Sequence, residues 1–194
     1  MPKSSKGGAF ERHVADRLSY WWTGDPNQSV FWRTSQSGGR ATVRRRKGKF
    51  TAGHCGDIAS TDPCSAPFTR LFAVEVKRGY KGVTFADLLD MPSSRVGKEF
   101  AGWVLQAEHA WSNSNSWSWL LITRRDVSIP LVIMPRDSFD DLGRYGAFVG
   151  NQPIPFVILR SEMVDLVALH FEQFLAQLNV QELIAFEQRI ADAS

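Results

Sequence analysis

The sequence predicts an α/β fold in which helices flank a central, mixed β-sheet. Segments with apolar residues at helical spacing open the chain, recur near its middle and close it, and short apolar runs of strand length lie between them. The resulting order of helix, strands, helix, strands and helix is typical of one sheet with helices on its faces. Because 194 residues suffice for one sizeable core, we expect a single domain over residues 1–194.

The first helix is predicted over residues 8–22, after a flexible basic tail at 1–7. Apolar residues three or four positions apart form a stripe along it, as in a helix that buries one face. The stripe consists of Phe10, Val14, Leu18 and Trp21. Glu11 lies beside this stripe, so its carboxylate is expected at the edge of the core rather than in open solvent.

Short apolar runs predict several strands. They cover residues 30–33, 57–60, 70–77, 117–123, 129–134 and 155–160. Residues 34–50 are polar, basic and rich in glycine, and they are predicted to form a mobile loop. Residues 61–69 contain two prolines and are predicted to form a second loop.

Two further helical regions are predicted. Residues 94–112 carry an apolar face at helical spacing. Residues 161–194 are predicted to be a C-terminal helical segment in two parts that separate near 178–181. We expect this segment to pack against the sheet or against a second subunit.

The composition excludes several classes of protein. Hydrophobic residues make up 43% of the chain and charged residues 22%, as in ordinary soluble domains. No apolar run approaches the roughly 18 residues of a membrane span, and the first residues lack the apolar core of a signal peptide. A cytoplasmic protein without a membrane partner is therefore expected. Cys55 and Cys64 are too few for a disulfide framework.

The net charge of +3 conceals an asymmetry along the chain. Residues 1–50 contain 11 Lys/Arg and 3 Asp/Glu, whereas residues 161–194 contain 1 Arg and 6 Asp/Glu. Seven basic residues and no acidic one fall within 33–49. This concentration suits a polyanionic partner, and a solvated basic loop is the alternative.

The most informative motif is Glu75-Val76-Lys77, at the end of an apolar run. Side chains alternate along a strand, so Glu75 and Lys77 should share one face. Asp57, on a neighbouring strand, would complete a pair of carboxylates beside an ammonium group. Such a cluster can bind a hard divalent cation and activate water against a phosphodiester.

Four segments extend this motif into a recognisable pattern. They are KGGAFERHVADRL, WRTSQSGGR, GDIAS and FAVEVKRG, all within residues 6–80. In this order they resemble the archaeal Holliday-junction resolvases of the PD-(D/E)XK nuclease superfamily. The resemblance implies a restriction-endonuclease-like core, a Mg²⁺ cofactor that Mn²⁺ can replace, branched DNA as partner and a homodimer. Gly56 replaces the usual proline before the aspartate, and beyond residue 112 no similarity is apparent.

The resemblance also implies roles for individual residues. Asp57, Glu75 and the backbone carbonyl of Val76 would bind the metal ion, with Glu11 completing the acidic shell directly or through water. Lys77 would orient the attacking water or stabilise the transition state as a fixed charge. The scissile phosphate would be held by Arg12, Arg33 and Ser37, although Ser37 could be only a turn residue. Gln106 would position the lysine or the water, or would be a plain surface residue. Phosphates of the DNA arms would be contacted by Arg40, Arg44, Arg45, Arg46, Lys47 and Lys49.

Alternative functions remain open at this point. The chain could be another nuclease of the superfamily that acts on flaps, forks or DNA ends, or a non-catalytic DNA-binding protein with the same fold. A zinc site is disfavoured, because His54, Cys55 and Cys64 match no zinc-ligand spacing and have no second pair. Trp32, beside the basic loop, is a candidate DNA contact.

Overall fold

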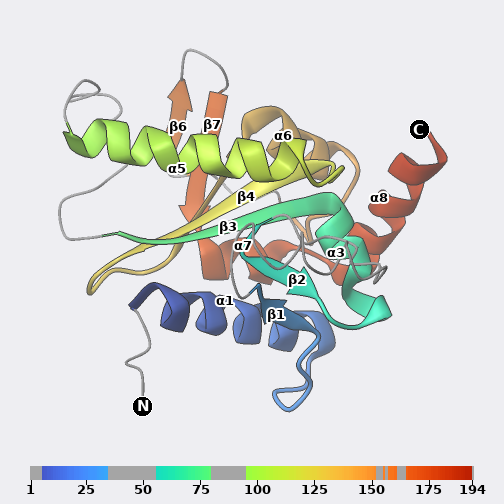
Figure 1. Cartoon of the computed structure of the whole chain (residues 1–194). Coiled ribbons are helices and arrows are strands. Elements are labelled where there is room, and N and C mark those ends of the chain that lie inside the picture. The colour runs from blue at the N-terminus through green and yellow to red at the C-terminus, as the bar shows by residue number, and fades with distance from the viewer. Residues whose placement is uncertain are drawn as a thin grey trace.

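The computed structural model describes residues 6–34, 56–79, 95–151, 155, 157–160 and 165–193. Its helices are α1 Lys6–Thr23, the 3₁₀ turn η1 Pro63–Ser65, α3 Ala66–Leu71, α5 Arg95–Ser112, α6 Arg136–Arg144, α7 Phe171–Gln177 and α8 Val180–Asp192. Its strands are β1 Phe31–Arg33, β2 Ile58–Ser60, β3 Phe72–Gly79, β4 Ser118–Arg125, β5 Leu131–Pro135, β6 Val157–Arg160 and β7 Asp165–His170. The α/β fold class predicted from the sequence, a mixed sheet flanked by helices, is confirmed (Figure 1).

The main sheet has five strands in the order β3-β4-β5-β7-β6. Among the described strands, β3 and β4 are the one parallel pair, and α5 makes the crossover between them, as a parallel pair requires. β1 and β2 form a separate antiparallel pair. β3 is therefore an edge strand of the main sheet, and its outer edge is available to the segment that leads into β2.

The two faces of the sheet carry separate apolar clusters because side chains alternate along each strand. On one face, Val74 and Val76 of β3 join the cluster that includes the apolar stripe of α1. On the other face, Ala73 packs with Phe100 and Val104 of α5. Figure 1 shows α1 and α5 on opposite sides of the sheet. The predicted helices 8–22 and 94–112 are thus present, each with its apolar face buried.

The predicted loop at 61–69 is wrong for most of its length, because η1 and α3 occupy it. The carboxylate of Asp62 accepts a hydrogen bond from the N–H of Cys64 at 2.9 Å and so caps the first turn. Pro67 stands in the first turn of α3, where its missing N–H has no helical partner to lose. Because α3 continues to Leu71, the strand predicted from residue 70 begins at Phe72.

The C-terminal region also differs from the prediction, since residues 165–170 form β7 rather than helix. Leu166, Val167, Ala168 and Leu169 are all buried, because β7 lies between β5 and β6 with apolar clusters on both faces. A strand buried on both faces gives a continuous apolar run, which periodicity alone does not separate from a helix. The predicted break near 178–181 is confirmed, and the Asn179 side chain caps α8 there.

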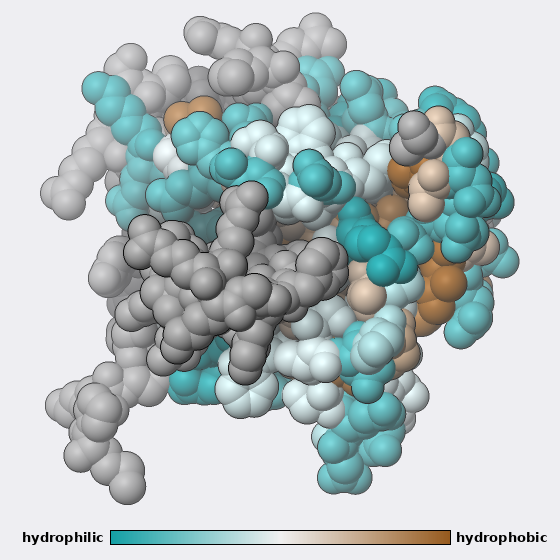
Figure 2. All heavy atoms as spheres, turned by 45° about the vertical axis from the view of Figure 1, so that its right-hand side comes forward, coloured by the Kyte–Doolittle hydropathy of each residue, from teal (hydrophilic) through white to brown (hydrophobic). Residues whose placement is uncertain are grey.

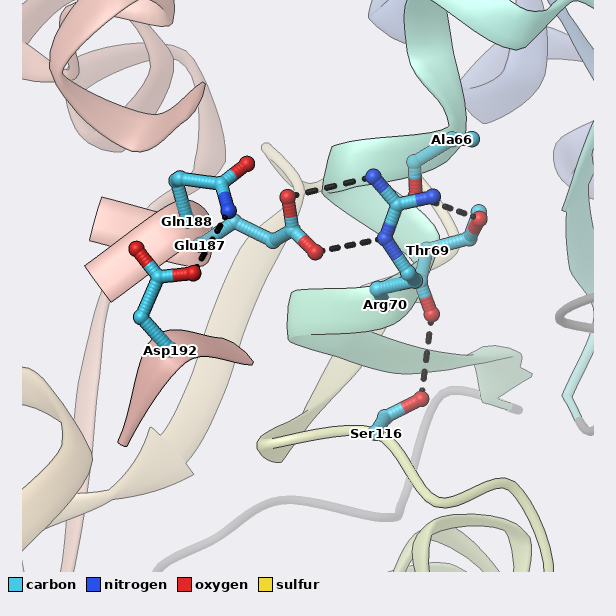
Figure 3. Close-up of polar contacts among 7 residues, drawn as sticks. All are labelled: Ala66, Thr69, Arg70, Ser116, Glu187, Gln188 and Asp192. Atoms are coloured by element: carbon cyan, nitrogen blue, oxygen red, sulfur yellow. Dashed lines mark hydrogen bonds and ion pairs between the residues drawn. The ribbon is translucent and has the colours of Figure 1, made fainter. Parts of the chain in front are cut away.

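The C-terminal helix is tied to the segment that precedes β3. Glu187 of α8 pairs with Arg70 of α3 through two contacts, Nε to Oε1 at 2.5 Å and Nη2 to Oε2 at 3.1 Å (Figure 3). Phe186 packs edge-to-face on Trp117, just before β4. α8 lies at the right of Figure 1, and Figure 2, which turns that side forward, shows apolar surface there among polar side chains.

Some predictions fall on residues that the structure does not describe. These are most of the basic tail at 1–7 and residues 35–50 of the predicted mobile loop. None of the helices in the described ranges is long and apolar enough to cross a membrane.

Candidate active site

β3 positions the two ends of the Glu-x-Lys motif as the alternation rule predicts. Val76 turns into the apolar cluster, whereas Glu75 and Lys77 leave the strand on the other face. Glu75 is only 7% exposed, and its Oε1 lies 2.5 Å from Nζ of Lys77. A carboxylate at this depth is stable as an anion only with a partner, and Lys77 provides one.

Asp57 is fastened to the free edge of β3 by two hydrogen bonds. Its backbone N–H donates to the carbonyl of Val74 at 2.7 Å, and its Oδ2 accepts from the N–H of Val76 at 2.8 Å. Thr34 supports this arrangement from the other side, because its N–H donates to the Asp57 carbonyl and its hydroxyl donates to the Gly56 carbonyl, both at 2.7 Å. The carboxylate of Asp57 is thereby held at Val76, the residue between Glu75 and Lys77.

Gly56 allows this close approach. Its φ of +109° lies in the region that residues with a side chain rarely adopt. A Cβ on Gly56 would also stand 2.5 Å from the carbonyl oxygen of Val74, well inside contact distance. The glycine that replaces the superfamily's usual proline is therefore required by the local geometry.

α1 and β1 bring a third carboxylate and a guanidinium group to the site. Nη1 of Arg33 donates to Oε2 of Glu11 at 3.2 Å and to the carbonyl of Gly8 at 3.4 Å. Both side chains are partly exposed, so each can still meet a ligand from solvent. Arg12, the next residue on α1, is exposed and lowers the pKa of Glu11 to a small extent.

The three carboxyl groups influence one another electrostatically. Burial is the main reason that the pKa of Glu11, of Asp57 and of Glu75 is raised above its usual value. The negative charge of Asp57 further raises the pKa of both Glu11 and Glu75. Lys77 and Arg33 oppose these effects without cancelling them. Burial therefore disfavours the charged forms of these carboxyl groups, and a cation bound between them would favour those forms.

The donor set fits a hard divalent ion. The available ligands are carboxylate and backbone oxygens, which suit Mg²⁺ or Mn²⁺ and not zinc. Within the described ranges, no three His, Cys, Asp or Glu side chains are arranged as a complete metal cage. Mg²⁺ does not require one, because it is commonly held by one or two carboxylates and keeps several waters.

Of the predicted site residues not yet placed, the structure describes only Gln106. Gln106 is exposed on α5, and among the described residues it has no hydrogen bond to Glu75 or Lys77. The other predicted contacts lie outside the described residues. They are Ser37, Arg40, Arg44, Arg45, Arg46, Lys47 and Lys49. Their roles stay predictions, as do those of Gln106 and Arg12.

Sequence reasoning missed Thr34, and the sequence marks Gly56 only as a departure from the pattern of the nucleases that the chain resembles. Both residues act through the backbone around Asp57, with Thr34 as a hydrogen-bond donor and Gly56 as a residue without a side chain. The only sequence signal for them is their position beside the basic segment and before the aspartate. That signal does not reveal a contact with β3.

Comparison with known proteins identifies the family. The family model described as phage putative PDDEXK endonuclease matches residues 3–185, nearly the whole chain. The chain therefore belongs to this family and, through it, to the PD-(D/E)XK nuclease superfamily. No curated protein and no solved structure gives a significant match.

Proposed function

We propose that this member of the phage PDDEXK endonuclease family is a Mg²⁺-dependent, structure-selective DNA endonuclease that resolves Holliday (four-way) junctions. One observation carries the proposal: Glu11, Arg33, Asp57, Glu75 and Lys77 come from four separate parts of the chain and converge on the free edge of β3. A non-catalytic DNA-binding protein would have no physical reason to hold three partly buried carboxyl groups beside a lysine.

The residues at this edge would hold the metal ion in a defined way. Asp57 and Glu75 would provide carboxylate oxygens, the carbonyl of Val76 a backbone oxygen, and Glu11 a further contact directly or through water. When bound, the ion would supply Lewis acidity toward the phosphate and a more acidic water. The hydrogen bond from Val76 N–H leaves Asp57 oriented before any ion arrives.

The two cations would act on the phosphate and the water. Lys77 stands 2.5 Å from Glu75, so a water near this pair could be oriented by both side chains. Arg33, held by Glu11 and by the carbonyl of Gly8, would present its guanidinium group to a phosphate. Arg12 and Ser37 would bind the neighbouring phosphates of the same DNA strand.

The choice of branched DNA rests on the charge distribution and on the resemblance to resolvases. The basic residues within 33–49 precede Asp57 directly in sequence and would bind phosphates without reading bases. A four-way junction has near two-fold symmetry and needs two cuts, so we propose a C2 homodimer with one site per subunit. Mn²⁺ would replace Mg²⁺, since both ions accept oxygen ligands.

The test is cleavage of end-labelled four-way junction, flap, fork, duplex and single-stranded DNA with Mg²⁺, Mn²⁺ or EDTA. Wild type is expected to make paired, symmetric cuts in the junction, and Glu75→Gln should reduce cleavage by at least about a hundredfold. Cutting of flaps, forks or ends instead would assign the chain to another branch of the superfamily. Tight junction binding without any metal-dependent cleavage would support a non-catalytic binding protein.

A further inference from the structure

The turn between β4 and β5, residues 126–130, exposes apolar side chains without an evident structural reason. Val127 is 95% exposed and Ile129 is 59% exposed. Val127 also has a φ of +61°, in the left-handed region that β-branched residues avoid. A strained, fully exposed valine at the tip of a turn contributes nothing to the core, and such outliers concentrate at functional positions.

Hydrogen bonds at its base hold this turn in place. Nε and Nη2 of Arg78 both donate to Oδ1 of Asp126, at 3.1 and 3.0 Å. Nε of Arg124 donates to the carbonyl of Ser128 at 3.0 Å. The turn is thus connected to β3 as well as to its own strand, and these hydrogen bonds hold the position of its tip.

The β4–β5 turn also lies at the same end of the sheet as the catalytic lysine. In the parallel pair, Lys77 is opposite Thr123 and Arg78 is opposite Arg124. Val127 comes only a few residues after Thr123, the residue opposite Lys77, and each residue of a strand spans about 3.3 Å. Figure 1 shows the end of β3 and the β4–β5 connection on the same, left-hand side of the molecule.

The charges around the turn indicate which partner it meets. Arg125 is exposed immediately before the turn, and Arg78 and Arg124 flank its base. Apolar tips beside arginines are the combination with which proteins enter base steps while holding the adjacent phosphates. A purely apolar partner would make no use of the exposed positive charge of Arg125.

We infer that Val127 and Ile129 form an apolar wedge that opens the base stack of DNA next to the phosphodiester cleaved at the β3 edge. This inference rests on the proposed function, because the wedge serves the same DNA and the same site. Arg125 contacts the phosphate beside the opened step, and the Arg78–Asp126 pair keeps the tip in register with Lys77. The wedge would favour branched DNA, where base steps at the branch point are already weakened.

The test measures base unstacking separately from cleavage. A Glu75→Gln background prevents cutting, and the probe is a fork or a four-way junction with 2-aminopurine at successive positions around the branch. Val127→Asn replaces the most exposed apolar side chain of the wedge with a residue that tolerates positive φ, so the fold should be retained, as a thermal melt checks. Val149→Asn is the matched control, since Val149 is 56% exposed and follows α6, away from the turn.

The expected result is increased 2-aminopurine fluorescence at one or two positions with the Glu75→Gln protein and with its Val149→Asn variant, and loss of this increase with Val127→Asn. In the otherwise wild-type chain, Val127→Asn should slow cleavage by roughly tenfold to a hundredfold, because opening a base step costs a few kcal/mol. Equal fluorescence and equal cleavage with Val127→Asn would overturn the wedge and leave the nuclease proposal standing. Absence of cleavage by every protein, with the fluorescence difference retained, would overturn the nuclease proposal and support the wedge.

Discussion

At the scale of single residues, the site holds carboxyl groups whose charged forms are disfavoured in the absence of a metal ion. Burial raises the pKa of Asp57, and the hydrogen bond from Val76 N–H and the charges of Lys77 and Arg33 offset this only in part. A carboxyl group whose pKa is higher in the folded than in the unfolded state binds protons more tightly when folded. Folding stability from this group therefore falls as pH rises through the two pKa values.

Asp57→Asn is thus expected to stabilise the metal-free protein at pH 7. The amide keeps an oxygen that can accept from Val76 N–H, and it removes the charge that burial disfavours. The measurement is a thermal melt in EDTA across pH 4 to 8, and the difference from wild type should shrink toward acid pH, where Asp57 is protonated in both states. With Mg²⁺ at about 100 times its Kd, wild type alone should gain about 2.7 kcal/mol. A variant that is less stable than wild type in EDTA at pH 7 would refute this account of the cluster.

The same residues show how far sequence reasoning reaches. Glu75, Lys77 and Asp57 were predictable because strand alternation and the order of motifs constrain side-chain direction. Thr34 was not predictable, since its role depends on a hydrogen bond to the carbonyl of Gly56, 22 positions away. The need for glycine at position 56 arises from its close approach to the backbone of Val74. A local sequence pattern does not reveal this contact between distant parts of the chain.

At the scale of elements, the Arg70–Glu187 pair joins α3 to α8, and its two partners differ in burial. The Glu187 side chain is 11% exposed and that of Arg70 is 53% exposed. Loss of the arginine leaves a nearly buried carboxylate without its partner, whereas loss of the glutamate charge leaves a guanidinium group that water can solvate.

Arg70→Ala should therefore cost about 2 kcal/mol or more of unfolding free energy, and Glu187→Gln about 1 kcal/mol or less. Urea denaturation of both single variants and of the double variant measures the costs and their coupling. The double variant should be more stable than Arg70→Ala alone, because the buried charge is then gone. Equal costs for the two single variants would mean that burial does not control this contact.

Helices were predicted well where periodicity is clear, and the prediction was wrong at β7, whose apolar run is continuous. α1 and α5 each bury one stripe, so their extents were close to the prediction. β7 is buried on both faces, and its continuous apolar run does not distinguish the observed strand from the predicted helix. α6 was not predicted, and only Phe139 and Leu142 of its nine residues are buried, which leaves little apolar pattern to detect.

At the scale of the whole molecule, the basic residues within 33–49 and the acidic C-terminal region lie at different places in the sequence, so DNA affinity should depend on which charges are removed. Each phosphate contact by Lys or Arg contributes about 0.9 to the slope of log K against log salt. Changing Arg44, Arg45 and Arg46 together to Gln should therefore reduce the slope by about 2.7 if all three contact phosphates. Fluorescence anisotropy of labelled junction DNA between 50 and 300 mM salt, with the Glu75→Gln protein, which is expected not to cleave, measures this change.

A second triple variant separates local contacts from net charge. Arg136, Arg144 and Arg189 lie on α6 and α8, and changing all three to Gln alters the net charge equally. α6 follows the end of β5, which runs antiparallel to β4, so it begins at the opposite end of the sheet from the β4–β5 turn. This control should leave the slope nearly unchanged, because screened charges beyond a Debye length of about 10 Å add little. Equal effects of the two triple variants would mean that DNA responds to overall charge, and the proposed path of DNA over residues 33–49 would then be wrong.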